Sequence, residues 1–237
     1  MNLETPVPLP IEPLQDGETH PTASAPQPAI SRLLPPAMAL AGASAQAGAD
    51  DLLVKIQSKD DAVRGAAWQG AALAGPEALR PLAGLLDNAD FEIARSAKRA
   101  MRIIVHRCGR PDGEADRKAA QAELVALLVG QPTSVRREAL WLLSEIGDKE
   151  ASAPMAALLA EEAVWEDARC ALLRLPGREV LVVFQQAFAS APEDFKFALA
   201  DAMRERGKQV PQYPTRRTLP TKSTGVGAKP EPAKSGT

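Results

Sequence analysis

Residues 134–147 read SVRREALWLLSEIG, and the spacing within this stretch decides the fold. Val135 is followed by Ala139, Leu142, Leu143 and Gly147, at intervals that place apolar or small residues on one side of a helix. Four other segments carry the same order of apolar and small residues, beginning at Val63, Ile93, Val164 and Phe195. The five starting positions, 63, 93, 135, 164 and 195, lie 30, 42, 29 and 31 residues apart. The stretch is therefore the third of five copies of a repeat.

A second helical pattern precedes each copy, in residues 50–56, 76–86, 115–128, 149–159 and 178–188. Turn-forming or capping residues separate the two patterns at 58–61, 87–90, 131–134 and 191–194. The unit is thus a helical hairpin of about 30 residues, which is too small to bury its own apolar stripe, so neighbouring hairpins must stack. We predict an all-α fold, an α-solenoid of about five stacked HEAT-like hairpins over residues 49–207, with Leu143 buried between hairpins.

The composition agrees with this fold and sets limits on function. Hydrophobic residues make up 45% of the chain but aromatic residues only 4%, so Ala and Leu supply most of the apolar surface, as helices favour. No apolar run reaches the roughly 18 residues of a membrane span. The formal charge of −2 gives no general argument for binding nucleic acid.

The two ends of the chain differ from the repeats in composition. Residues 1–48 hold nine prolines and a net charge of −3, and residues 208–237 hold five prolines and a net charge of +5. The repeats between them carry −4. Neither end shows long apolar periodicity, so we predict a disordered Pro/Ala-rich segment over 1–48 and a disordered, basic, Pro-rich tail over 208–237.

Residues 31–47, SRLLPPAMALAGASAQA, have the layout of a secretory signal peptide. A basic residue precedes a modest apolar stretch, and Ala45-Gln46-Ala47 supplies a small-residue end. The segment begins only at residue 31, and Pro35 and Pro36 interrupt it. We therefore predict a cytoplasmic protein, with export to the periplasm as the alternative if residues 31–47 act as a signal peptide.

The repeats resemble HEAT-like repeats of the short type that is also found in relatives of the phycobilin lyases. The resemblance rests on five copies in one register and on the Val-Arg…Ala pattern of Val63-Arg64 with Ala67 and of Val135-Arg136 with Ala139. The other three copies replace the arginine, with Ala94, Trp165 and Lys196. The resemblance implies a scaffold in which the second helix of each hairpin lines a concave side that binds a partner.

Positions of the second helices outside the apolar stripe are the candidates for partner binding. Arg95, Lys98, Arg99 and Arg102 have i, i+3, i+4, i+7 spacing, which places four cations on one helix face. The neighbouring copies add a further set of candidates: Trp68, Gln69, Arg137, Trp141 and Arg169. Trp and Arg are favoured at the centres of interfaces, so we predict a protein or peptide partner of acidic character.

A second interpretation of the same residues needs no partner. The cations could form a solvated face neutralised by Glu92, Glu138 or Glu145, and Trp68 and Trp141 could cover seams between hairpins. On the first interpretation, glutamate at Lys98, Arg99 and Arg102 leaves the fold intact and abolishes partner capture. Trp165, at a capping position, is expected to be a packing residue.

The long interval between the second and third copies contains an insertion near residues 108–116, beside His106 and Arg107. Gly109 is expected to end the preceding helix. A reactive Cys108 beside cations would have a lowered pKa, but no base or oxyanion site accompanies it in the sequence, and a structural loop is favoured. Cys170 is expected to be a buried or partly buried hydrophobic residue.

We predict a non-catalytic protein–protein interaction scaffold or adaptor, without a cofactor or metal. A nucleic-acid-binding HEAT-like array is one alternative, opposed by the −4 charge of the repeats. A cofactor or pigment lyase-type HEAT protein is the other, and it lacks a Cys/His/acid cluster at helical spacing. The chain has two histidines, too few for the paired His-Glu motifs of the HEAT-like di-iron hydroxylases.

Overall fold

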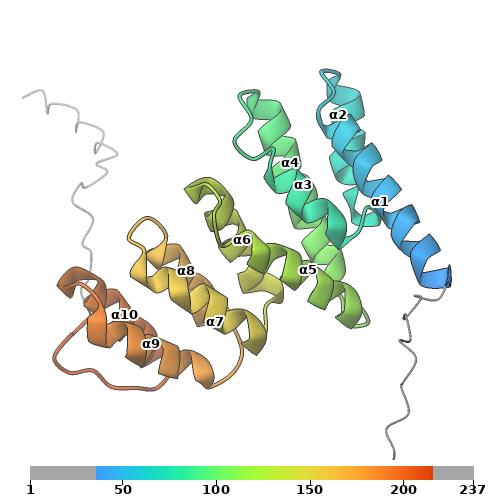
Figure 1. The fold of residues 1–237 in the computed structure, drawn as a ribbon. Coiled ribbons are helices and arrows are strands. Elements are labelled where there is room, and N and C mark those ends of the chain that lie inside the picture. Colours follow the sequence, from blue (N-terminus) through green and yellow to red (C-terminus); the bar gives the residue numbers. More distant parts are fainter. Residues whose placement is uncertain (1–35, 216–237) are drawn as a thin grey trace, which may run out of the picture. The chain divides into compact units, whose positions relative to one another are not determined.

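A computed structural model describes residues 36–215. Within these residues ten α-helices follow one another along the chain (Figure 1). They are α1 (Pro36–Ile56), α2 (Asp61–Gln69), α3 (Leu79–Ala83), α4 (Phe91–Cys108), α5 (Glu114–Ala126), α6 (Thr133–Ile146), α7 (Lys149–Ala157), α8 (Trp165–Arg174), α9 (Glu179–Ser190) and α10 (Glu193–Glu205). Three short 3-10 helices accompany them: η1 (Ala71–Leu73), η2 (Pro76–Ala78) and η3 (Leu158–Ala160).

Consecutive helices pair as hairpins, and the hairpins stack. The pairs α1/α2, α3/α4, α5/α6, α7/α8 and α9/α10 are each in contact. The second helices also contact each other in order, α2 with α4, α4 with α6, α6 with α8 and α8 with α10. The first helices form a matching series through η2, α3, α5, α7 and α9. The predicted all-α solenoid of five hairpins is confirmed.

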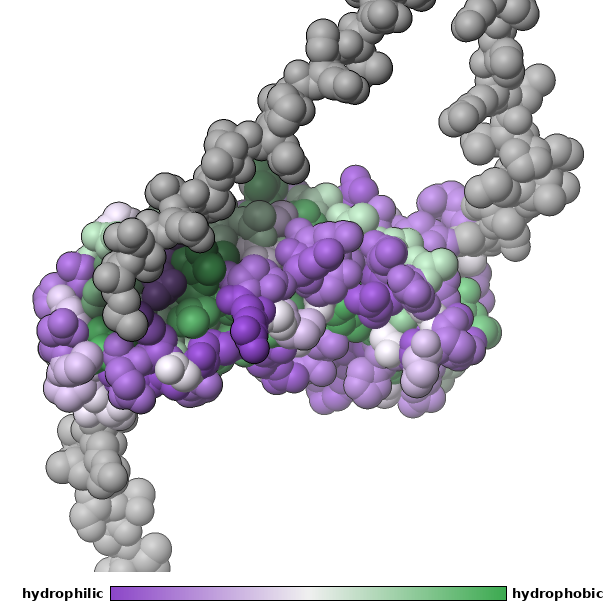
Figure 2. Space-filling view, turned by 90° about the horizontal axis from the view of Figure 1, so that it is seen from below, coloured by the Kyte–Doolittle hydropathy of each residue, from purple (hydrophilic) through white to green (hydrophobic). Residues whose placement is uncertain are grey.

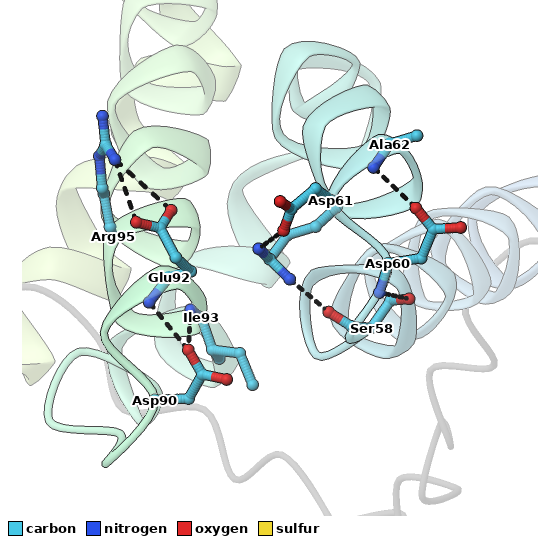
Figure 3. Close-up of polar contacts among 9 residues, drawn as sticks. Ser58, Asp60, Asp61, Ala62, Asp90, Glu92, Ile93 and Arg95 are labelled. Atoms are coloured by element: carbon cyan, nitrogen blue, oxygen red, sulfur yellow. Dashed lines mark hydrogen bonds and ion pairs between the residues drawn. The ribbon is translucent and has the colours of Figure 1, made fainter.

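Aspartate side chains cap the N-termini of several of these helices. Asp60 accepts a hydrogen bond from the backbone N–H of Ala62 at the start of α2, and Asp90 accepts one from Glu92 at the start of α4 (Figure 3). Both caps lie in the segments that the sequence predicted to separate helices, and they satisfy N–H groups that have no partner within the helix. The helix α4 ends at Gly109, as predicted.

The arginines of the Val-Arg…Ala pattern are structural. The guanidinium of Arg64 is buried, donates to the Ser58 carbonyl at 2.7 Å and pairs with Asp61. It therefore ties α2 to the turn that precedes it. Arg136 pairs with Glu161, which joins the third hairpin to the fourth. These contacts explain an arginine at this position without a role in binding.

Polar side chains also connect hairpins through the first helices. The buried amide of Gln121 on α5 donates to Asp148 at 2.9 Å and accepts from the Asp148 backbone N–H at 3.0 Å. Asp148 is the N-cap of α7. Partial burial acts to raise the pKa of Asp148, but the hydrogen bonds from Gln121 and Glu150 and the charge of Arg117 hold it below its ordinary value. The carboxylate therefore stays charged and keeps both hairpins in register.

Two parts of the structure differ from the predicted element bounds. The first helix begins at Pro36 instead of residue 50, so the predicted signal-like segment 31–47 runs into a helix continuous with the first hairpin. Residues 1–35 of the predicted disordered segment lie outside the described part of the chain. The predicted helix 76–86 is shorter, because it divides into η2 and the five-residue α3.

The beginning of the predicted basic tail, residues 208–215, packs against the last hairpin. Val210 is buried, and the ring of Tyr213 lies 5.0 Å from those of Phe188 and Phe197 in edge-on contacts. Arg204 donates hydrogen bonds to the carbonyl groups of Val210 and Tyr213. This segment therefore covers apolar surface at the end of the array. The remaining tail, residues 216–237, lies outside the described residues.

The core is built mainly from Ala and Leu. Ala97, Ala139 and Ala168, three of the small residues of the repeat, are fully buried, and so is Leu143. Trp165 stacks on Phe195 with ring centroids 4.4 Å apart, so it is a packing residue, as predicted. The surface seen from below is mainly hydrophilic, with hydrophobic side chains gathered in a hollow in the left part of the view (Figure 2). Among the described residues no helix is both long enough and apolar enough to span a membrane.

We expect Leu143→Ala to lower the free energy of unfolding by about 2–5 kcal/mol, because Leu143 is completely buried and the change leaves a cavity. Urea denaturation followed by circular dichroism measures this loss. The matched control is Val129→Ala, at a side chain that is 79% exposed, which should change stability by less than about 0.5 kcal/mol. Equal stability of the Leu143→Ala protein and the unchanged chain would contradict the stacked packing.

Candidate binding face

All nine predicted site residues lie on second helices, which contact each other in series. We call the exposed sides of these second helices together the binding face. Trp68 and Gln69 come from α2, Arg137 and Trp141 from α6, and Arg169 from α8. The helix α4 supplies the four remaining cations, Arg95, Lys98, Arg99 and Arg102.

Three contacts join tryptophans to arginines across neighbouring helices. The guanidinium carbon of Arg99 lies 4.9 Å from the ring centroid of Trp68, and that of Arg102 lies 6.0 Å from Trp141. Arg174 of α8 approaches Trp141 at 5.5 Å. An arginine over an indole ring is attracted by the ring quadrupole. Helices α2, α4, α6 and α8 are thus connected by alternating Trp and Arg side chains.

Trp141 is the more accessible of the two tryptophans in this series. Its side chain is 48% exposed, although tryptophan is a residue that usually packs. Trp68, by contrast, is partly buried against the core, as the packing interpretation expected. A depression of about 210 Å³ lies on one side of Trp141, lined also by Arg102 and His106. A smaller depression of about 90 Å³ lies on its other side, toward Arg174 of α8.

A third depression, of about 360 Å³, lies near the beginnings of α4 and α6. Phe91, which is largely exposed, and Leu86 line it together with Arg95 and Lys98. Apolar and cationic side chains are therefore adjacent here as well as around Trp141. This combination suits a ligand that carries both an apolar group and a carboxylate.

Acidic residues neutralise most of the cations. The carboxylate of Glu138, which is only 5% exposed, forms ion pairs with Lys98 at 2.7 Å and with Arg102 at 2.9 Å. Arg95 points toward Glu92 on its own helix, with 3.1 Å between charged atoms (Figure 3). The ion pairs that the second interpretation expected of Glu92 and Glu138 are thus present.

The remaining predicted cations differ in their surroundings. Arg99 is the one member of the α4 set without an ion pair to any described residue. Arg137 pairs with Asp167 of α8 at 3.0 Å. Arg169 is held by Glu166 and lines a separate depression beside α10, so it does not join the residues around Trp141. Gln69 is exposed at the end of α2.

Sequence reasoning missed Arg174. Its partner Glu145, at 2.5 Å, was expected to neutralise the α4 cations and pairs with α8 instead. Arg174 and Glu145 each lie ten positions after the first apolar residue of their copy, Val164 and Val135. A comparison of equivalent positions in successive copies shows these opposite charges and could have found the pair.

The two cysteines have different surroundings, and neither is a low-pKa thiol. Cys108 is buried, and burial, with a smaller contribution from Asp116, raises the pKa of its thiol to about 11 instead of lowering it. Cys170 is exposed, so its prediction as a buried or partly buried hydrophobic residue is wrong. Partial desolvation still raises the pKa of the Cys170 thiol. Within the described residues, no group of three or more His, Cys, Asp and Glu side chains could hold a metal ion.

Comparisons with known proteins give only distant likenesses. No protein-family model matches the chain. No curated protein matches it either. A designed armadillo repeat protein in complex with a (KR)4 peptide is 24% identical, with 72% of this chain and 84% of that chain covered and a TM-score of 0.39. A crystal structure of an engineered protein is 22% identical over the same shares of the two chains, with a TM-score of 0.35. Values this low carry no information about a partner.

Charge reversal at both partners of Glu138 should destabilise the fold, which revises the expectation that these positions are neutral to folding. In Lys98→Glu/Arg102→Glu the buried Glu138 carboxylate would lose its cations and face two new acids. Because both cations are about half exposed, we expect a loss on the order of 2 kcal/mol, below that of a fully buried pair. Thermal and urea melts measure it. Arg95→Glu is the control, since its partner Glu92 is exposed and the loss should stay below about 1 kcal/mol.

The thiols should differ in reactivity and in pH dependence. At neutral pH a thiol reagent should label Cys170 in the folded protein and Cys108 only after unfolding. An unfolded Cys108 loses its proton near the ordinary pKa of 9.0, whereas the folded thiol keeps it to about 11. Stability from this group is therefore fully present below pH 9 and falls as the pH rises toward 11. Urea midpoints across this interval should fall less for Cys108→Ala, and an equal fall in both proteins would contradict the raised pKa.

Proposed function

We propose that this protein is a non-catalytic interaction scaffold of short HEAT-like repeats that binds acidic segments of a partner protein on its binding face. The observation that carries the proposal is Trp141, half exposed between Arg102 and Arg174. The indole ring beside the Arg174 guanidinium offers one apolar contact and one site for a carboxylate, whereas Nε and Nη2 of Arg102 already bind Glu138. Trp and Arg in this arrangement are typical of the residues that dominate interface energies.

The paired state of the cations favours a peptide over a nucleic acid. Arg174 pairs with Glu145, and Arg137 pairs with Asp167. Both acids are exposed enough for a partner's carboxylate to replace them. Arg99 has no ion pair with a described residue, so it can bind a partner's carboxylate without displacing another acid. A nucleic acid would instead need a broad field of unpaired cations, and the repeats carry −4. Ion pairs across such a face contribute more to selectivity than to affinity, so the apolar contact with Trp141 would supply most of the affinity.

The two thiols favour a binding role over nucleophilic chemistry. Both thiols have raised pKa values, which disfavour the nucleophilic thiolate. His106 lines the depression beside Trp141, where it could contact a bound carboxylate. We propose a cytoplasmic location and leave export as the alternative, because residues 31–35 of the signal-like segment lie outside the described part.

The test is a fluorescence anisotropy titration with a labelled peptide of alternating glutamate and leucine. We expect binding, and we expect Trp141→Ala to weaken it roughly 30-fold, the size of an interface hot spot. Arg174→Gln should weaken it less. Arg80→Gln is the matched control, an arginine paired with Glu123 on first helices, and should leave the affinity unchanged.

Two further probes decide between partner classes. A peptide with glutamine in place of glutamate should bind at least tenfold more weakly, because it cannot pair with Arg99 or Arg174. A DNA duplex should bind only weakly. Equal binding of both peptides, an unaffected Trp141→Ala protein, or tight and steeply salt-dependent DNA binding would each overturn the proposal.

A further inference from the structure

A second candidate surface lies on the outer side of the first hairpin. A depression of about 460 Å³ is formed there by α1, α2 and η1. Small residues, among them Gly48, Ala66 and Gly70, line its floor together with Leu52. We call it the end groove. It shares no lining residue with the depressions beside Trp141.

Comparison with equivalent positions in the later copies shows that the first hairpin lacks a neighbour that covers its apolar positions. Gly70 lies seven positions after Val63 and is exposed. The residues seven positions into the other copies are at most 3% exposed: Ala100, Leu142, Ala171 and Ala202. Val63 itself is 40% exposed, whereas Val135, Val164 and Phe195 are buried. In the later copies the preceding hairpin covers these positions, and within the described residues nothing covers them in the first.

An exposed apolar side chain stands beside the end groove. Leu73 on η1 is among the groove residues and is 92% exposed. A projecting leucine next to a groove lined by small residues is a shape that can fit a second copy of itself. Surface of this kind on a terminal repeat is a marker of an interaction, because terminal repeats normally present polar outer faces.

The two ends of the array differ in this respect. Val210 and Tyr213 cover apolar surface of the last hairpin, so the chain closes that end itself. Ahead of α1 the sequence is poorly suited to supply a further hairpin, because eight prolines fall in residues 1–35 and proline breaks helices.

We propose that a second copy of this chain covers the end groove in a two-fold symmetric dimer, with Leu73 of each copy in the groove of the other. The charges favour a second copy over another protein. Asp51 and Lys55, one turn apart on α1, both line the groove and are about half exposed, and within one copy they pair with each other at 2.6 Å; the dimer would exchange these ion pairs between the copies. In an antiparallel pair of α1 helices, Asp51 of one copy faces Lys55 of the other. Such self-complementarity is what a two-fold contact requires, and a partner of one charge sign would satisfy only half of it.

The first test is the molecular mass of the full chain by sedimentation equilibrium, from low to high micromolar concentration. We expect a reversible dimer, and we expect Leu73→Asp to raise its dissociation constant at least about 30-fold. Val129→Asp is the matched control, at a valine that is 79% exposed outside the groove, and should dimerise like the unchanged chain. Leu73 is almost fully exposed within one copy, so an unchanged circular dichroism spectrum of Leu73→Asp will show that the fold is intact.

The second test addresses the two-fold arrangement. Asp51→Lys and Lys55→Asp should each weaken the dimer, and the chain with both changes should recover it. A full chain that stays monomeric, a dimer that tolerates Leu73→Asp, or a double exchange that fails to restore association would overturn the proposal. A monomer would leave the groove to residues 1–35 or to another protein. Trp141→Ala should not affect the mass, and Leu73→Asp should not affect peptide affinity, so this proposal and the proposed function fail separately.

Discussion

The close approach of alanine-lined helices is the constraint on which the array depends. Ala97, Ala139 and Ala168 occupy the same repeat position in three second helices, and all are fully buried. A side chain of one methyl group lets neighbouring backbones lie near each other, so that leucines such as Leu143 can fill the remaining space. A larger residue at this position would separate the hairpins. Each hairpin is thus stable only with its neighbours, and binding residues must occupy the positions that stacking does not use.

This constraint explains why the fold could be predicted from the sequence. Helical periodicity and capping residues are local properties, so five copies in one register predicted ten helices and turn-forming or capping segments at 58–61 and 87–90, where the caps Asp60 and Asp90 lie. The start of α1 was harder, because an alanine-rich segment after Pro35-Pro36 suits both a signal-like stretch and a helix. The cover formed by Val210 and Tyr213 was missed, since contacts of Tyr213 with Phe188 and Phe197 join residues distant in sequence.

The candidate site could be predicted only in part, for a related reason. Helical spacing placed every candidate residue on a second helix, but it could not say which charges meet between helices. The burial of Glu138 beneath Lys98 and Arg102 depends on how α4 and α6 stack. The approach of Arg174 to Trp141 depends in the same way on α8. Contacts between copies therefore have to come from the structure, although opposite charges at equivalent positions are a usable signal.

The geometry of α2 has a consequence for how the two proposed surfaces would work together. Val63, Ala66 and Gly70 recur at helical spacing on the side of α2 that faces the end groove, whereas Trp68 faces Arg99 of α4. One helix can thus contribute to both surfaces without the two sharing a residue. A dimer through the end groove would leave both binding faces open and join them in one particle. Two weak sites joined in this way bind a partner with two acidic segments much more tightly than either site alone, because the second contact forms at high effective concentration. Most cations of the binding face are already paired, so a single face would bind selectively but with low affinity. Joining two such faces in one dimer would therefore increase the affinity most.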